Sequence, residues 1–169
     1  MEVGFRRVDI DDHAATRKLV YDAFVSTGSE ETAAFLDALR AEGCILGEWL
    51  AEDSSGPVAH IVFSRVWLEQ RNGRRLKAAM LTPLAVRPDR QRRGTGTRLM
   101  DHALKELESR GETLFFVLGH PSYYPRVGFR PASAAAIESP WSGNPAFMVR
   151  GEIVPAGRLV MPSVIADAH

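Results

Sequence analysis

Apolar residues recur at helical spacing in three stretches of the chain, each with polar start signals or a glycine stop. The helices predicted from this pattern cover residues 11–24, 29–42 and 95–110. The third is the clearest, because its apolar residues form one continuous stripe and Gly111 follows as a stop. This stripe consists of Leu99, Met100, Ala103, Leu104 and Leu107.

Apolar runs of strand length precede, separate and follow these helices. The predicted strands cover residues 5–10, 45–51, 58–68, 75–86, 113–118, 146–149 and 158–160. Asn72-Gly73 is a strong hairpin signal between the third and fourth strands. Pro83 lies inside the fourth strand and cannot donate to a ladder, so a bulge or local splay is expected there.

The order of these elements predicts how the strands are connected. The strand 75–86, the helix 95–110 and the strand 113–118 follow one another, which implies a right-handed parallel crossover. Tyr123–Val127 is expected to form one helical turn, closed by Gly128. The region from Pro131 to Pro145 predicts a loop. The length of 169 residues fits a single domain, residues 1–169.

Composition narrows the function classes. The formal net charge is zero, so the chain has no global attraction to nucleic acid or to an anionic membrane. The single cysteine, Cys44, allows no intrachain disulfide. We expect a cytoplasmic location, because the first residues contain no apolar signal core and no run approaches the ~20 apolar residues of a spanning helix. The histidines show no metal-ligand spacing, so we expect no metal.

The segment Gln91-Arg92-Arg93-Gly94-Thr95-Gly96 lies between a predicted strand and the start of the clearest helix. The first N–H groups of a helix have no internal partner, and the helix dipole adds positive potential there. Glycines let an anion approach the backbone, and arginines add charged donors, which together favour a phosphate site. The alternative is a solvated turn within a plain basic surface, because five arginines lie between Arg87 and Arg98.

Two other phosphate motifs fit this segment less well. A P-loop requires a lysine after its last glycine, and none follows Gly96. A dinucleotide fingerprint requires a small residue where Leu99 stands.

With its flanking residues, the segment resembles the GNAT superfamily, the GCN5-related N-acetyltransferases. It is similar to that family's Gln/Arg-x-x-Gly-x-Gly/Ala signature for acetyl-CoA, and Leu84–Pro88 resembles the strand end that precedes it. Tyr124–Phe129 resembles the family's Tyr-x-x-x-Gly-Phe segment, at the expected spacing. The strings Thr82–Val86 and Gly119–Tyr124 are most similar to the YhbS-like subgroup. The resemblance covers Phe5 to about Phe129.

The resemblance implies an α/β (α+β) fold: a mixed, twisted central sheet of about seven strands, with helices on both faces and splayed central parallel strands. It implies acetyl-CoA as cosubstrate, with the strand before the loop along the pantetheine arm and the loop N–H groups on the pyrophosphate. The cofactor-binding residues implied in this way are Leu84, Ala85, Val86, Gln91, Arg92, Arg93, Gly94, Thr95, Gly96 and Thr97.

By the same resemblance, Tyr124 is the candidate general acid toward the sulfur of CoA. A phenol with a pKa near ~10 is protonated at neutral pH and can donate. Aromatic packing is the alternative role for Tyr124, and the expected one for Tyr123. The general base is not evident, because residues 78–86 contain no Asp or Glu. The candidate substitutes, acting directly or through water, are Glu48, His60, Glu69 and His120.

The leading hypothesis is an acetyl-CoA-dependent N-acetyltransferase. The acceptor is a primary amine, on a small molecule or a peptide, that attacks the thioester directly without a covalent enzyme intermediate. The family resemblance also allows a homodimer. A second hypothesis is a non-catalytic acyl-CoA-binding or regulatory module. Binding to nucleic acid through the arginines is a third, disfavoured by the zero net charge and the lack of a binding motif.

Selection of the acceptor is expected to involve the two early helices, the segment Val25–Ser29 and the loop Ile137–Ala146. Trp67, Trp141 and Phe147 are candidate pocket residues, with packing in the core as the alternative.

Overall fold

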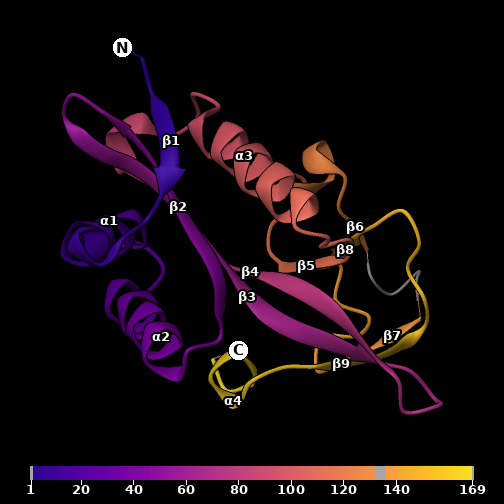
Figure 1. Ribbon diagram of the computed structural model, residues 1–169. Coiled ribbons are helices and arrows are strands. Elements are labelled where there is room, and N and C mark those ends of the chain that lie inside the picture. The colour runs from indigo at the N-terminus through magenta and orange to yellow at the C-terminus, as the bar shows by residue number, and fades with distance from the viewer. Residues whose placement is uncertain (1, 132–135, 169) are drawn as a thin grey trace. The chain divides into compact units, whose positions relative to one another are not determined.

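The computed structural model describes residues 2–131 and 136–168 (Figure 1). Its elements are β1 (Gly4–Arg7), the 3-10 helix η1 (Ile10–Asp12), α1 (His13–Ala23), α2 (Ser29–Glu42), β2 (Ile45–Asp53), β3 (Gly56–Glu69), β4 (Arg75–Val86), η2 (Pro88–Arg90), α3 (Thr95–Ser109), β5 (Phe115–Leu118), η3 (Tyr124–Val127), β6 (Arg130–Pro131), β7 (Ile137–Glu138), β8 (Phe147–Arg150), β9 (Gly157–Val160) and α4 (Ser163–Ala166). The α/β fold class predicted from the sequence is confirmed.

The sheet is mixed. Within the described residues its strands follow the order β1-β2-β3-β4-β5-β8-β6, with β9 on β3 and β7 on β9. β4 and β5 are parallel and α3 lies between them in the chain, so the predicted parallel connection through this helix is present. β5 with β8, and β1 with β2, are antiparallel. The pairing of β4 with β5 includes Ala79 with Phe115 and Met80 with Phe116, shortly before Pro83, whose peptide bond to Thr82 is cis.

An irregularity in β4 was expected at Pro83, and the hydrogen bonds of the β3–β4 hairpin require one. At the turn, Gln70 N donates to Arg74 O at 2.8 Å, and at the other end Arg87 N donates to Val58 O at 2.8 Å. Between these two bonds β4 has one residue more than β3. An extra residue on one strand is the definition of a β-bulge.

Three details differ from the sequence prediction. The first strand ends at Arg7 rather than Ile10, because Asp9 and Asp12 form a capping box that starts η1. The strand β7 and Pro131, the last residue of β6, lie in the region Pro131–Pro145 that was predicted as a loop; residues 132–135 of that region lie outside the described residues. The short helix α4 was not predicted.

The chain packs into two compact units, and the long strands β3 and β4 contribute to both. Unit 1 comprises Met1–Phe63 and Thr82–Glu106, and unit 2 comprises Ser64–Leu81 and Leu107–His169. The expectation of a single domain over residues 1–169 stays a prediction. In the described ranges, the helices are too short or too polar to span a bilayer.

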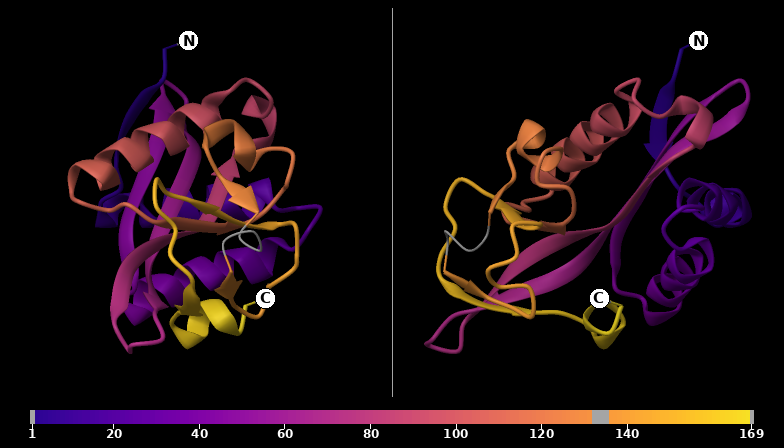
Figure 2. Two further views of the ribbon diagram at one scale, coloured as in Figure 1. Left: turned by 90° about the vertical axis from the view of Figure 1, so that its right-hand side faces the viewer. Right: turned by 180° about the vertical axis from the view of Figure 1, so that it is seen from behind.

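In unit 1, helices cover both faces of the sheet. α1 and α2 pack side by side on one face, and α3 lies on the other (Figures 1 and 2). Successive strand residues point to opposite faces, and β2 shows this directly. Glu48 binds Arg40 of α2, whereas the next residue, Trp49, donates from Nε1 to Glu106 Oε2 of α3 at 2.7 Å.

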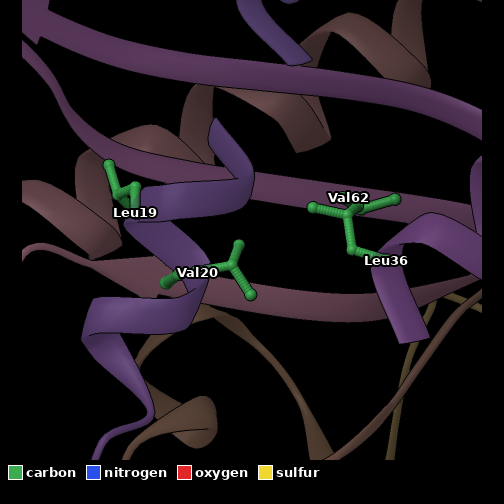
Figure 3. Close-up of a cluster of buried hydrophobic side chains, with 5 residues drawn as sticks. Leu19, Val20, Leu36 and Val62 are labelled. Carbon is green, nitrogen blue, oxygen red and sulfur yellow. The ribbon is translucent and has the colours of Figure 1, made fainter. Parts of the chain in front are cut away.

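The core beneath α1 and α2 joins two helices to two strands (Figure 3). Leu19 and Val20 of α1 and Leu36 of α2 pack against Val62 of β3 and Ala85 of β4. All five side chains are buried. The hydrophobic residues that defined the predicted helices therefore fix the positions of β3 and of the last residues of β4.

Unit 2 has its own aromatic core. Phe116 of β5 stacks on Phe147 of β8 with ring centres 5.7 Å apart, and Trp141 packs on Phe147 at 5.6 Å. The guanidinium carbon of Arg65 lies over the Trp67 ring, 5.8 Å from the centre of the ring. Arg65 also binds the buried Glu112. Trp67, Trp141 and Phe147 therefore make packing contacts. Packing was the alternative to a pocket role for these three residues.

Candidate active site

In unit 1, α3 begins directly after a turn that two backbone conformations create. Arg92 and Gly94 have φ angles of 63° and 80°, in the left-handed region. Arg98 N donates to Gly94 O at 3.0 Å, which closes the first turn of α3. The N–H groups of a helix's first turn have no partner within the helix and carry the positive end of its dipole. The first N–H groups of α3 therefore lie directly after this turn without partners within the helix, an arrangement that favours an anion.

Two of the five arginines in this region hold the loop in place. Arg87 donates from Nε and Nη2 to Asp89, at 2.6 and 3.1 Å, and from Nη1 to Ser55 Oγ at 3.1 Å. Arg90 forms an ion pair with Asp53, whose side chain is fully buried. Hydrogen bonds from Ser55, together with Arg90, hold the pKa of Asp53 far below its ordinary value. The β2–β3 turn thus anchors the chain that leads into the loop.

The other arginines differ in their partners. Arg98 lies over the ring of Phe5, 5.2 Å from its centre. Arg92 and Arg93 are exposed, and neither forms an ion pair with any residue that the structure describes. A plain basic surface does not explain this division. Arg98 has no carboxylate partner among the described residues either, and Arg92 and Arg93 are the two that lie in the loop directly before α3, where an anion would bind.

The strand before the loop presents its backbone at a fixed orientation. Ala85 is buried in the core beneath α1 and α2, so the half-buried Leu84 and Val86 point to the opposite face. Gln91 donates from Nε2 to Val86 O at 3.0 Å. Its side chain therefore ties the loop to the strand, a role distinct from the ligand contact that the family resemblance implied for Gln91.

Tyr124, the candidate acid, lies in unit 2 at the start of η3. Its ring is packed edge-to-face against Tyr123 and Phe129, with ring centres 5.0 and 5.8 Å away. No described residue is hydrogen-bonded to Oη. Burial raises the pKa of Tyr124, and Tyr123 adds to the effect. The phenol is therefore protonated at neutral pH and available as a donor.

Gly119 leaves the space that the ring of Tyr124 occupies. A Cβ atom at Gly119 would overlap Cε2 of Tyr124. We expect Gly119→Ala to displace the ring and to destabilise the protein by about 1–3 kcal/mol, as overpacked sites do. Urea unfolding measures this change, with Gly4→Ala as the matched control, because a Cβ at Gly4 meets no atom within 4 Å. Equal stability of the two variants would contradict the prediction.

The candidate bases occupy different environments. Glu69 lies in unit 2 and binds Arg75 and Arg158 at 2.9 and 2.7 Å, which makes it part of an ion-pair cluster at the end of the β3–β4 hairpin. His120 is exposed, and its backbone oxygen accepts from Tyr123 N at 3.0 Å. Glu48 and His60 are buried together in unit 1, so the structure joins two candidates that the sequence treated separately.

Glu48 is the centre of this buried network. It accepts from Arg40 Nη2 at 2.8 Å, from Arg40 Nε at 3.1 Å and, through Oε2, from His60 Nε2 at 2.8 Å. Arg40 Nη2 also donates to Thr16 Oγ1 at 2.9 Å. Burial by itself raises the pKa of Glu48, but the hydrogen bonds from His60 and Arg40 outweigh it and lower the pKa from 4.5 to about 2. Glu48 is therefore an anion at neutral pH.

No group of His, Cys, Asp and Glu side chains in the described parts of the chain could hold a metal ion. The positive groups that could hold an anionic cofactor are instead Arg92, Arg93 and the start of α3.

Comparison with known proteins identifies the family. A family model described as the Acetyltransferase (GNAT) domain matches residues 4–132. The chain belongs to the GNAT acetyltransferase family. The match contains both the loop before α3 and Tyr124, the two segments on which the sequence resemblance was based.

Known GNAT proteins resemble the chain over most of its length. The uncharacterized N-acetyltransferase YjhQ of Escherichia coli (strain K12) is 33% identical over 130 residues, which are 76% of this chain and 70% of YjhQ.

Among solved structures, a GNAT acetyltransferase from Brucella melitensis in complex with acetyl-CoA is 25% identical with a TM-score of 0.79, over 97% of this chain and 98% of that one. The GNAT N-acetyltransferase YhbS of Escherichia coli in complex with CoA is 23% identical with a TM-score of 0.86, over 98% and 92%. The fold of this chain is therefore the GNAT fold.

Proposed function

We propose that this GNAT chain transfers an acetyl group from acetyl-CoA to a primary amine. The observation that carries the proposal is the start of α3, where Arg92 and Arg93 have no carboxylate partner among the described residues while Arg87 and Arg90 are fixed by ion pairs. The Brucella melitensis relative, in complex with acetyl-CoA, supports the choice of cofactor.

In this proposal the cofactor's diphosphate binds at the loop. The N–H groups of residues 92–97 and the guanidinium groups of Arg92 and Arg93 neutralise its charge. The backbone of Leu84, Ala85 and Val86 lies along the pantetheine arm and fixes the thioester. Gln91 acts through the loop, by fastening it to Val86 O.

Acyl transfer then requires a neutral amine, a polarised carbonyl and a protonated leaving group. The amine attacks the thioester carbon directly, the C–S bond breaks, and the sulfur takes a proton from Tyr124 Oη. The lack of a described hydrogen-bond partner for this hydroxyl supports this role. No covalent enzyme intermediate is needed.

The direct test is release of free CoA from acetyl-CoA with a panel of primary amines that includes small amines, amino acids and peptides. Turnover with any of them supports the proposal. Calorimetric binding of acetyl-CoA without turnover over the whole panel would instead favour a non-catalytic acyl-CoA-binding module. The missing carboxylate on residues 78–86 is the feature that keeps this second role open.

Replacing both Arg92 and Arg93 with Ala is expected to weaken the binding of CoA by roughly 10-fold or more, because two charge-assisted donors are lost. Calorimetry at two salt concentrations measures the affinity and its salt dependence, which should also decrease. Acetyl-pantetheine lacks the diphosphate and should bind both proteins equally. Arg71→Ala is the matched control, since Arg71 is exposed and lies outside the loop. Unchanged CoA affinity in the double variant would remove the loop from the site.

A further inference from the structure

One buried polar atom has no hydrogen-bond partner in the described part of the chain: Nδ1 of His60. The imidazole is fully buried on β3. Its other nitrogen, Nε2, lies 2.8 Å from Glu48 Oε2. Buried polar groups are nearly always satisfied, so a single unpartnered atom points to a ligand or a water that binds there.

The neighbours of His60 determine its tautomer. The charged and titratable groups that face it are Glu48 on β2, Arg40 on α2 and His13 on α1. Burial lowers the pKa of His60, against the opposing effect of Glu48, so the ring is neutral at neutral pH. Glu48 is anionic and can only accept, so the proton lies on Nε2 and Nδ1 carries a free lone pair. His60 therefore presents a proton acceptor.

The position of His60 relates this acceptor to the proposed cofactor strand. Val62, two residues along β3 on the same face, packs with Ala85 of β4 beneath α1 and α2. His60 thus shares its sheet face with Ala85. Nε2 is directed toward Glu48 on β2, and the two ring nitrogens of an imidazole point away from one another. Nδ1 therefore does not face Glu48.

We infer that His60 is the general base of the transfer reaction, acting at Nδ1 directly or through one water. The inference rests on the proposed function. Arg40 and Glu48 are positioning residues: Arg40 fixes the Glu48 carboxylate, and Glu48 fixes the tautomer and orientation of the imidazole. A base held by a carboxylate in this way follows the same logic as the histidine of a catalytic triad.

The proton balance of the step is complete. The acceptor's ammonium group gives one proton to His60 Nδ1, and Glu48 stabilises the imidazolium that forms. The neutral nitrogen forms a bond with the thioester carbon, and the C–S bond breaks with its electron pair on sulfur. The sulfur takes the proton of Tyr124 Oη, and the phenolate recovers a proton from the new amide nitrogen. The products are the acetamide, CoA and the imidazolium of His60, whose proton passes to a water molecule before the next turnover.

The test compares the wild type with His60→Gln, in which the amide nitrogen can still donate to Glu48 but no base remains. Two acceptors are used: an alkylamine, which is protonated at pH 7, and a weakly basic arylamine or hydrazide, which is already neutral. With the alkylamine, kcat/KM is expected to fall roughly 100-fold or more at pH 7. With the weakly basic amine the loss should be small. The alkylamine deficit should also shrink as the pH rises toward the amine's own pKa.

A merely structural role for His60 gives a different result. The loss in kcat/KM, corrected for the folded fraction measured by circular dichroism, would then be equal for both amines and at every pH. That outcome overturns the inference. If His60→Gln fails to fold, 15N spectra of labelled histidines in the wild type provide the test. A protonated Nδ1 on His60 at pH 7 overturns the inference. An unprotonated Nδ1 whose 15N chemical shift changes on adding amine and CoA supports it. A wild type that turns over neither amine removes the proposed function and this base together.

Discussion

Tyr124→Phe is expected to lower kcat by roughly 100-fold or more while the affinity for acetyl-CoA stays unchanged. The substitution removes only the hydroxyl, so the packing of the ring against Tyr123, Phe129 and Gly119 is retained. Without a proton donor the sulfur must leave as a thiolate, which raises the barrier of the step in which the C–S bond breaks. A loss in kcat with constant acetyl-CoA binding is the signature of an interaction made only in the transition state.

The measurement is steady-state kinetics with the best amine of the panel, combined with calorimetry for acetyl-CoA. Tyr123→Phe is the matched control, because it removes the same atom from the adjacent ring. It is expected to retain activity within about 3-fold, as substitutions away from chemistry do. A Tyr124→Phe enzyme as active as the wild type would exclude Tyr124 as the acid and leave that role to water.

Glu48→Gln is expected to destabilise the fold by about 3–5 kcal/mol at pH 7, because it leaves the buried Arg40 without its counter-charge. The side chains of Arg40 and Glu48 are only 12% and 8% exposed, so solvent cannot compensate for the loss. The new amide group also directs one N–H toward a donor, since both Arg40 and His60 donate to Glu48.

The effect of Glu48→Gln should depend on pH with a defined sign. Glu48 has a pKa of about 2 in the folded protein against 4.5 as its ordinary value. The unfolded chain therefore binds more protons in this range, and the stability that Glu48 provides is complete above pH 4.5 and is lost as the pH falls toward 2. The difference in unfolding free energy between wild type and variant should narrow over that interval.

Urea unfolding at pH 7 and pH 3 measures both effects. Glu30→Gln is the control, because the Glu30 side chain is 70% exposed and its ion pair with Arg17 is 3.5 Å long. Its cost should stay within about 0.5 kcal/mol. A Glu48→Gln variant as stable as this control would show that the buried network contributes little to the fold.

Local features of the sequence predicted most of the elements correctly. The apolar stripe of α3 and the left-handed Gly43, which ends α2, are both local signals. Each depends on residues within one or two helical turns. Likewise the turn Tyr124–Val127 ends at Gly128 with a φ of 87°. The misses have equally local causes. β6 and β7 have two residues each, too few to show a period, and the capping box of Asp9 and Asp12 interrupted an apolar run that otherwise suits a strand.

The chemical site was predictable only in part. The loop before α3 and Tyr124 could be found because each is a short, contiguous motif. The pairing of Arg90 with Asp53 joins residues 37 apart, and no sequence signal indicated which arginines would remain without an ion pair. Arg40 was missed for the same reason, since an arginine on a helix is ordinarily a solvated residue.

The sequence by itself therefore determined the family, the order of helices and strands, and the loop that favours an anion, because periodicity, caps and glycines act over a few residues. Only the tertiary structure decided which charges are neutralised and which side chains are buried. Those properties depend on which faces of β2, β3 and β4 meet α1 and α2. They therefore depend on contacts between residues that are distant in the chain. The pairing of Glu48 with His60, and the unpartnered nitrogen that results, belong to this second group.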